Sequence, residues 1–274
     1  MINLAEKPSI KIAGYGWRPQ LPDLNDLAYT PTDADLAAAH AVLTEHTVVD
    51  LRASGHMPDP YNQEQLGSCT ANSAAGDMEY TANRLGLKIG GTPSRLFIYY
   101  NERVMMGTVN EDSGATIRAS MKAMHKFGAP PENEWPYDIS KFTQRPPVAD
   151  FTDALKDVVL SYQGVRRAES YIVASLLAKR PVQIGFTVYE SFEQDIGNNG
   201  LMPWPQTGEQ VMGGHAVLVV GIVWINRKGY WIVRNSWGTG WADGGYFYMP
   251  LRYLMNTSLA SDYWNIQVQG AEAA

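Results

Sequence analysis

The chain has 274 residues, 45% of them hydrophobic, and a formal charge of −6 at pH 7. A chain of this length can bury a large core, as one big domain or as two lobes. Lys and Arg form no basic run along it, so we expect no nucleic-acid partner. The longest apolar run, residues 216–225, is too short to span a bilayer, so we expect no membrane partner.

The cysteine and histidine content restricts the chemistry. Cys69 is the only cysteine, so the chain has no internal disulfide and its fold must rest on its core. Such a chain suits a reducing compartment. Residues 1–8 lack the apolar stretch of an ordinary secretory signal, so we expect a cytoplasmic location and leave open export without such a signal. The histidines show no H-x-x-x-H spacing, so we expect no metal and no cofactor.

Residues 1–45 form an arm that precedes the rest of the chain. Residues 14–23 are rich in glycine, proline and aromatic side chains, which indicates an extended segment docked on the body. Residues 33–40 are expected to form a short helix with Thr32 as its N-cap. The arm is therefore predicted to contain a docked, extended segment followed by a short helix.

Three helices are predicted in the first half of the body. Residues 69–85 carry small and apolar side chains at helical spacing, and Gly86 can end the run. A second helix is expected over residues 92–107, with Pro93 at an early helical position. A third is expected over about residues 115–127.

The second half reads as strands separated by turn residues, with one helix over residues 170–179 among them. The β-rich runs are residues 181–188, the run that His215 opens, and residues 229–235, 245–249 and 262–268. Helices and strands are thus segregated along the chain. This order predicts an α+β protein with two layers of different type.

Cys69 lies where a loop becomes the first of these helices, after a Gly-Ser step. The positive end of a helix dipole favours thiolate over thiol. A lone cysteine is more commonly a small buried hydrophobic residue, but His215 and Asn235 further along the chain argue against that interpretation. Cysteine, histidine and asparagine are the nucleophile, the general base and the residue that orients the base in a thiol acyl-transfer site.

Three sequence blocks surround these residues: Gly-Ser-Cys at 67–69, His-Ala-Val at 215–217, and Asn-Ser-Trp-Gly-Thr-Gly-Trp at 235–241. Present together and in this order, they resemble the signature blocks of the papain-like (C1) family of cysteine peptidases, bacterial type, over roughly residues 46–268. The interval from the cysteine to the histidine is 146 residues and that to the asparagine is 166. The first lies within the family's span of about 130–150 and the second slightly beyond it.

The resemblance implies a two-lobe fold. A papain-like catalytic domain of residues 46–274 would follow the arm. It would have a helical lobe over about residues 60–150 and an antiparallel, β-barrel-like lobe over about residues 151–268. The active site would lie in the cleft between them, with Cys69 on a helix of one lobe and His215 on a strand of the other.

The family's roles carry over to the matching positions. Cys69 would attack the carbonyl carbon, and His215 would take the thiol proton, forming an ion pair, and later protonate the leaving amine. Asn235 would orient the imidazole. Gln63, six residues before the cysteine, matches the glutamine of the oxyanion hole, with the backbone N–H of Cys69 as second donor. Gln65 is an alternative that the spacing disfavours.

Five further residues are candidates for substrate binding. Ser113 and Gly114 resemble the segment that holds the peptide backbone as an added strand, although a helix cap and a turn glycine would look the same. Gly214 immediately precedes the histidine. Trp237 would shield the His–Asn hydrogen bond from water and Trp241 would line the far side of the cleft, or both would be core residues. A specificity pocket is implied near Ala129, Ala216 and Tyr263-Trp264.

The resemblance implies hydrolysis of a peptide or protein substrate through a Cys69 thioester, by a chain that we expect to be a monomer. Two alternatives stay open: a transferase (peptide ligase or cyclase) that passes the acyl group to an amine, and a non-catalytic binding protein under a fixed arm. The arm is shorter than the helical prosegments of the family. It is therefore either a minimal, inhibitory prosegment or a strap that pads one lobe.

Overall fold

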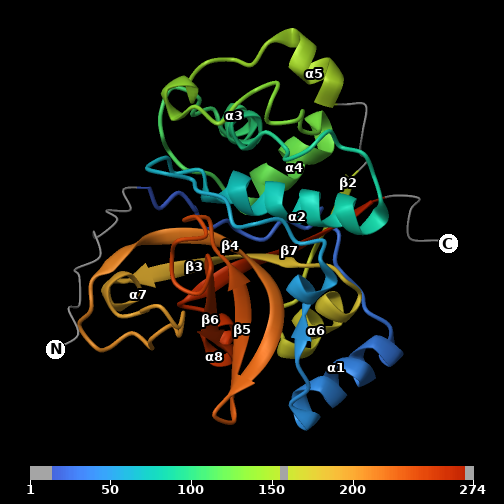
Figure 1. The fold of residues 1–274 in the computed structure, drawn as a ribbon, viewed down its shortest axis with the longest axis vertical. Helices are drawn as coiled ribbons and strands as arrows, with labels where there is room; N and C mark the ends of the chain where they lie inside the picture. The colour runs from blue at the N-terminus through green and yellow to red at the C-terminus, as the bar shows by residue number, and fades with distance from the viewer. Residues whose placement is uncertain (1–13, 155–159, 269–274) are drawn as a thin grey trace.

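The computed structural model describes residues 14–154 and 160–268, in which helices pack on a large antiparallel sheet (Figure 1). The helices are α1 (Asp33–Glu45), α2 (Cys69–Leu85), α3 (Arg95–Met106), α4 (Ile117–Phe127), α5 (Val148–Ala154), α6 (Glu169–Leu177), α7 (Glu190–Gln194) and α8 (Leu251–Met255), with 3₁₀ turns η1 (Leu51–Ser54) and η2 (Ile139–Lys141). The strands are β1 (Val49–Asp50), β2 (Leu160–Gly164), β3 (Val182–Tyr189), β4 (Val211–Ile225), β5 (Lys228–Arg234), β6 (Tyr246–Pro250) and β7 (Ala260–Val268). The α+β class is confirmed, although α7 and α8 lie among the strands in addition to the one predicted helix, which corresponds to α6.

The helical lobe is built mainly from α2, α3 and α4, where the apolar spacing predicts helices. α2 ends at Gly86, whose φ of 67° lies in the left-handed region that glycine adopts without strain. The side chain of Ser94 caps α3, so Pro93 precedes the cap rather than lying inside the helix as expected. α4 begins at Ile117 rather than at residue 115, because Thr116 is its N-cap.

The sheet has the order β2-β7-β3-β4-β5-β6, and the short β1 pairs with β4. The predicted strands correspond to β3, β4, β5, β6 and β7, whereas β1 and β2 are additions that the sequence pattern does not indicate. β4 is buried on both faces from His215 to Ile222, because α2 packs on the sheet there and the core of the β lobe fills the other side. The strand that carries the predicted base is thus the centre of the fold.

The arm contributes to both hydrophobic cores. Trp17 packs into the cluster around α2, and Tyr29 into the cluster of the β lobe. α1 is longer than predicted and packs against α6. Thr32 and Asp35 form a capping box at its start. Because buried aromatic rings contribute strongly to packing, the described part of the arm belongs to the folded body.

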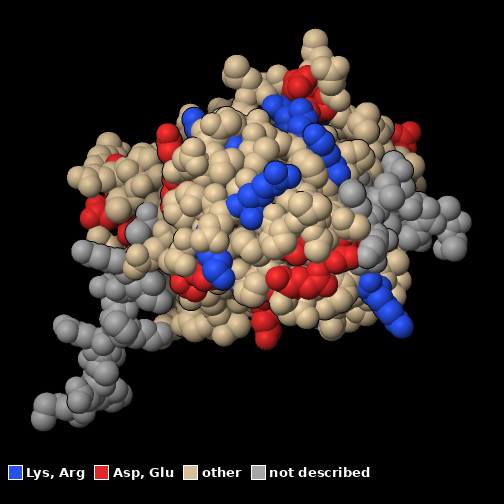
Figure 2. Space-filling model, turned by 90° about the horizontal axis from the view of Figure 1, so that it is seen from above, with Lys and Arg blue, Asp and Glu red and all other residues tan. Residues whose placement is uncertain are grey.

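The surface carries charges of both signs. On the face seen in Figure 2, Lys and Arg side chains of the described residues lie in separate groups among Asp and Glu. None of the helices in the described ranges is long and apolar enough to cross a membrane.

Candidate active site

Cys69 is the first residue of α2, and its side chain is fully buried against β4. The sulfur accepts a hydrogen bond from the Ala216 N–H at 3.4 Å, which brings it next to His215 along the strand. Ser68 occupies the N-cap position but makes no capping bond, and its hydroxyl instead lies 2.5 Å from the Tyr137 hydroxyl. The helical and β lobes therefore meet at the thiol.

His215 lies opposite Phe186 of β3 and is fully buried. Its Nε2 is 2.7 Å from Asn235 Oδ1, which also accepts the Ser236 N–H at 2.8 Å. An amide oxygen only accepts hydrogen bonds, so Nε2 carries the proton and Nδ1 is the basic nitrogen. Nδ1 has no hydrogen-bond partner among the described residues. This nitrogen is therefore available for the thiol proton of Cys69.

Two tryptophans cover the histidine–asparagine pair. Trp237 stacks on the His215 ring with centroids 5.0 Å apart and is only 5% exposed. Trp241 meets Trp237 edge-on at 4.8 Å and also contacts Phe192 and Phe247. Trp237 thus lies where it excludes water from the hydrogen bond, and Trp241 is a partly buried support behind it.

The two glutamines considered for the oxyanion hole differ in burial. Gln63 is fully buried, and its Nε2 donates to the Gly14 carbonyl at 3.0 Å and to the Leu66 carbonyl at 2.9 Å. Its Oε1 accepts from Ser236 Oγ at 2.5 Å, which fixes the amide. Gln65 is exposed. The side-chain donor that lies in the site is therefore Gln63.

Part of the arm runs through the site, at the junction of helices and sheet (Figure 1). The Trp17 N–H donates to the Gly214 carbonyl and the Arg18 N–H to the Ala115 carbonyl, both at 2.9 Å. The Ala115 N–H donates back to the Gly16 carbonyl at 2.7 Å. A peptide backbone is thus hydrogen-bonded to both sides of the cleft.

Of the two residues expected to bind a peptide strand, Gly114 lies against the arm and Ser113 bonds elsewhere. A Cβ on Gly114, whose φ is 66°, would lie 2.0 Å from the Gly16 carbonyl oxygen, so only glycine fits. The Ser113 hydroxyl bonds the Thr108 hydroxyl at 2.7 Å. The backbone pairing is made by Ala115, a residue that the sequence pattern does not single out.

Burial favours the uncharged forms of Cys69 and His215. It raises the pKa of the thiol to about 12, although backbone hydrogen bonds from Ala216 and Gly16 lower it. It lowers the pKa of His215 to about 4, although the bond to Asn235 raises it. Both shifts oppose the ion pair expected from the family, because desolvation of the two groups acts against the helix dipole.

The model of the papain family of cysteine proteases matches residues 46–263. The chain belongs to this family. It is accordingly a cysteine peptidase with the papain-like two-lobe fold, and its substrates are peptides or proteins.

Several relatives support the assignment to the papain family. An uncharacterized peptidase C1-like protein of Acanthamoeba polyphaga mimivirus is 38% identical, over 80% of this chain and 74% of its own length. The cathepsin L-like proteinase of Fasciola hepatica is 28% identical, over 73% of this chain and 59% of its own. The crystal structure of xylellain, a cysteine protease from Xylella fastidiosa, is 35% identical, with a TM-score of 0.81 over 96% of this chain and 99% of its own. The match with xylellain extends into residues 1–45 of this chain.

In the protein without substitutions, the rate of Cys69 alkylation is expected to be low. The rate should rise about tenfold per pH unit from about pH 6 to 9. Only the thiolate reacts, and with a thiol pKa of about 12 its fraction keeps growing across this window. Labelling with iodoacetamide, read by intact mass at several pH values, would check this. A plateau below about pH 8 would contradict a covered, neutral thiol.

Four residues at the site lie outside the family blocks. Tyr15 is edge-on to the catalytic histidine's ring, and its hydroxyl donates to the Glu193 carboxylate. Trp17 Nε1 donates to Asp262 Oδ2 at 3.0 Å. The sequence feature that points to Tyr15 and Trp17 is the Gly-Tyr-Gly-Trp stretch at 14–17. It indicates a docked segment but not where that segment docks.

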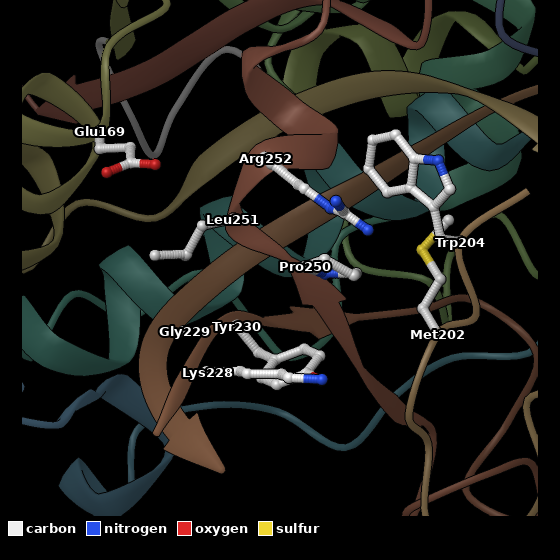
Figure 3. Close-up of a pocket in the computed structure, with 9 residues that line it drawn as sticks. All are labelled: Glu169, Met202, Trp204, Lys228, Gly229, Tyr230, Pro250, Leu251 and Arg252. Atoms are coloured by element: carbon white, nitrogen blue, oxygen red, sulfur yellow. The ribbon is translucent and has the colours of Figure 1, made fainter. Parts of the chain in front are cut away.

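A hollow of about 590 Å³ lies away from the cleft. The cleft itself is occupied by residues 14–18 of the arm. In Figure 3 the Arg252 guanidinium points toward Trp204, whose ring centroid is 4.0 Å away, while Lys228 and Tyr230 lie along another wall. None of the predicted site residues lines this hollow. Within residues 14–154 and 160–268, no group of three or more His, Cys, Asp or Glu side chains could hold a metal ion.

Proposed function

We propose that the chain hydrolyses peptide bonds through a thioester on Cys69, and that residues 14–18 block the site until the arm is displaced. In this mechanism His215 Nδ1 takes the thiol proton and delivers it to the leaving amine, while Asn235 holds the ring. Water then attacks the thioester carbonyl, loses a proton to the same nitrogen, and releases the acid and the free thiol.

The observation that carries this proposal is a peptide carbonyl of the arm held by the donor assigned to the oxyanion hole. The Gly14 carbonyl accepts the hydrogen bond of Gln63 Nε2. A scissile carbonyl at Cys69 that takes over this hydrogen bond becomes an oxyanion in the tetrahedral intermediate, and the same donor then stabilises it more strongly than the neutral carbonyl. We assign the second donor to the backbone N–H of Cys69, at the positive end of α2.

The direction of the arm explains why a bound arm is not a substrate. The leaving amine must lie beside His215, so the substrate segment after the scissile bond occupies the side where Tyr15 contacts that ring. The acyl segment then occupies the side of Trp17. In a substrate the acyl segment comes first along the chain, whereas in the arm Tyr15 precedes Trp17. The arm therefore runs against the substrate direction.

Contacts outside the cleft hold the rest of the arm. Arg118 of α4 pairs with Asp26 at 2.5 Å, and its backbone N–H donates to the Gln20 side chain at 2.9 Å. The Tyr29 N–H donates to the Gly164 carbonyl at 2.9 Å. Displacement of residues 14–18 would therefore open the site while the later part of the arm stays docked.

Gln63→Ala is expected to lower kcat of an arm-displaced enzyme about 10²–10³-fold, because it removes one oxyanion donor. Gln65→Ala is the matched control, since this exposed side chain should leave kcat within about twofold. Both would be measured with an internally quenched peptide, alongside melting temperatures, because Gln63 also bonds Ser236. A larger loss in Gln65→Ala than in Gln63→Ala would transfer the oxyanion role to Gln65.

We further propose that the chain works as a monomer in a reducing, cytoplasmic compartment, without nucleic-acid or membrane partners. The support is the net charge of −6 and the single, unpaired Cys69. Light scattering of the purified protein would test the monomer, with a dimer mass as the contradicting result.

A further inference from the structure

Within residues 14–18, the two aromatic side chains, Tyr15 and Trp17, each end on a carboxylate of the β lobe. Trp17 Nε1 donates to Asp262 Oδ2 at 3.0 Å, and the Gln20 N–H donates to the same oxygen at 3.3 Å. The Tyr15 hydroxyl donates to the Glu193 carboxylate. Side chains two residues apart in an extended segment point to the same side, so both reach this lobe. The arm thus donates hydrogen bonds to two carboxylates that have no role in the proposed mechanism.

Asp262 lies at the indole N–H end of the slot that Trp17 fills. A Cβ on Gly185 would lie 1.9 Å from the indole ring, and one on Gly214 would lie 2.5 Å from the Trp17 carbonyl oxygen. The two glycines therefore leave room for a large side chain. Burial raises the pKa of Asp262 to about 6, while the hydrogen bonds from the arm and the nearby Arg118 guanidinium lower it.

Arg118 is the cation that could compete for this carboxylate. Its guanidinium is held by Asp26, which lies further along the arm than the segment in the cleft. Loss of residues 14–18 from the cleft leaves that ion pair in place. Asp262 then loses the indole donor and keeps the Gln20 N–H, so the side chain that replaces Trp17 can supply a second donor and a positive charge.

Glu193 lies on α7, on the other side of the catalytic pair. Tyr15, which bonds it, has its ring 5.9 Å from that of His215 and 6.2 Å from that of Trp237. A Cβ on Gly213 would lie 2.6 Å from the Tyr15 Cβ, so this place is also kept open by a glycine. A carboxylate is therefore positioned on the side from which the leaving amine departs.

We propose that, once the arm is displaced, Asp262 and Glu193 select peptides with a cationic side chain on each side of the scissile bond. One cation occupies the slot of Trp17, on the acyl side, and the other takes the place of Tyr15, on the leaving-group side. Arg and Lys bring both N–H donors and positive charge to the two carboxylates. An aliphatic side chain would cover the Asp262 carboxylate without replacing the indole donor or bringing a positive charge, which is unfavourable. This selection rests on the proposed hydrolysis.

The test uses the full-length chain carrying Gly16→Ala, which displaces the arm, or Trp17→Ala if the first variant does not fold. Four internally quenched peptides share one sequence and carry Arg or Leu at each of the two positions, which are two residues apart. Arg at either position is expected to raise kcat/KM about fivefold or more. Asp262→Asn should abolish the preference for Arg on the acyl side only. Glu193→Gln should abolish the preference for Arg on the leaving-group side only. Leu peptides cleaved as well as Arg peptides, or preferences that survive both substitutions, would overturn the proposal.

A second measurement reads binding without turnover. Asn and Gln keep the size of the side chains they replace and can still accept a hydrogen bond, so only the charge is lost. The same peptides are tested for protection of Cys69 against iodoacetamide, read by intact mass. If the Arg peptides protect Cys69 and the Asp262→Asn substitution abolishes that protection, the selection is supported even when no peptide is cleaved. In that case only the proposed hydrolysis would be contradicted. Equal protection by Arg and Leu peptides would overturn the selection even with active enzyme.

Discussion

Gly16→Ala should raise peptide hydrolysis by the full-length protein roughly 5- to 150-fold. A Cβ on Gly16 would lie 1.7 Å from the Gly67 carbonyl oxygen and 2.4 Å from its carbonyl carbon. These are backbone atoms just before the helix of Cys69, so the arm is the part that must yield. Overpacking of this kind costs about 1–3 kcal/mol, and about 1.4 kcal/mol changes the population of the open state tenfold.

Turnover of an internally quenched peptide and the rate of Cys69 alkylation would be measured together for Gly16→Ala. Leu24→Ala is a control within the arm, because Leu24 is fully exposed. Gly240→Ala is a control for the residue change, because a Cβ there would meet nothing within 4 Å. Both should behave as the unaltered chain. A folded Gly16→Ala protein with neither faster alkylation nor faster turnover would favour the strap that only pads a lobe.

Cys69→Ala in the Gly16→Ala background should abolish hydrolysis, with a loss of about 10⁴-fold or more in kcat. The substitution removes the atom that forms the thioester, and neither the histidine nor the glutamine can replace it. Alanine leaves only a small cavity at this buried position, so we expect a loss of about 1 kcal/mol in the free energy of unfolding and an unchanged fold.

Ser73→Ala is the matched control for Cys69→Ala. Ser73 lies one turn further along α2, is 4% exposed, and its hydroxyl has no hydrogen-bond partner among the described residues. Its substitution should leave turnover within about twofold. Circular dichroism and melting temperature would establish that each variant folds. Measurable hydrolysis by a folded Cys69→Ala protein would remove the nucleophile assignment.

The sequence by itself determined the main elements and the family. Helical spacing after Cys69, the stop at Gly86 and the β-rich run at His215 are local patterns. The helix lies where its pattern predicts, and the strand includes the predicted run but begins at Val211 rather than at His215. Such patterns suffice because side-chain period, caps and turn residues depend on neighbours within a few positions. The order of cysteine, histidine and asparagine blocks likewise indicated the papain family.

Only the tertiary structure decided what lies over the nucleophile. The arm's Gly-Tyr-Gly-Trp stretch predicts docking, but its route past Cys69 depends on pairs such as Trp17 and Asp262, which are 245 residues apart. The same route shows Ala115 pairing with the arm and brings Glu193 to Tyr15. Burial also raises the pKa of the Cys69 thiol, and the pKa of a thiol at a helix start depends on how completely other segments exclude water from it. No local pattern encodes which distant segment supplies that cover.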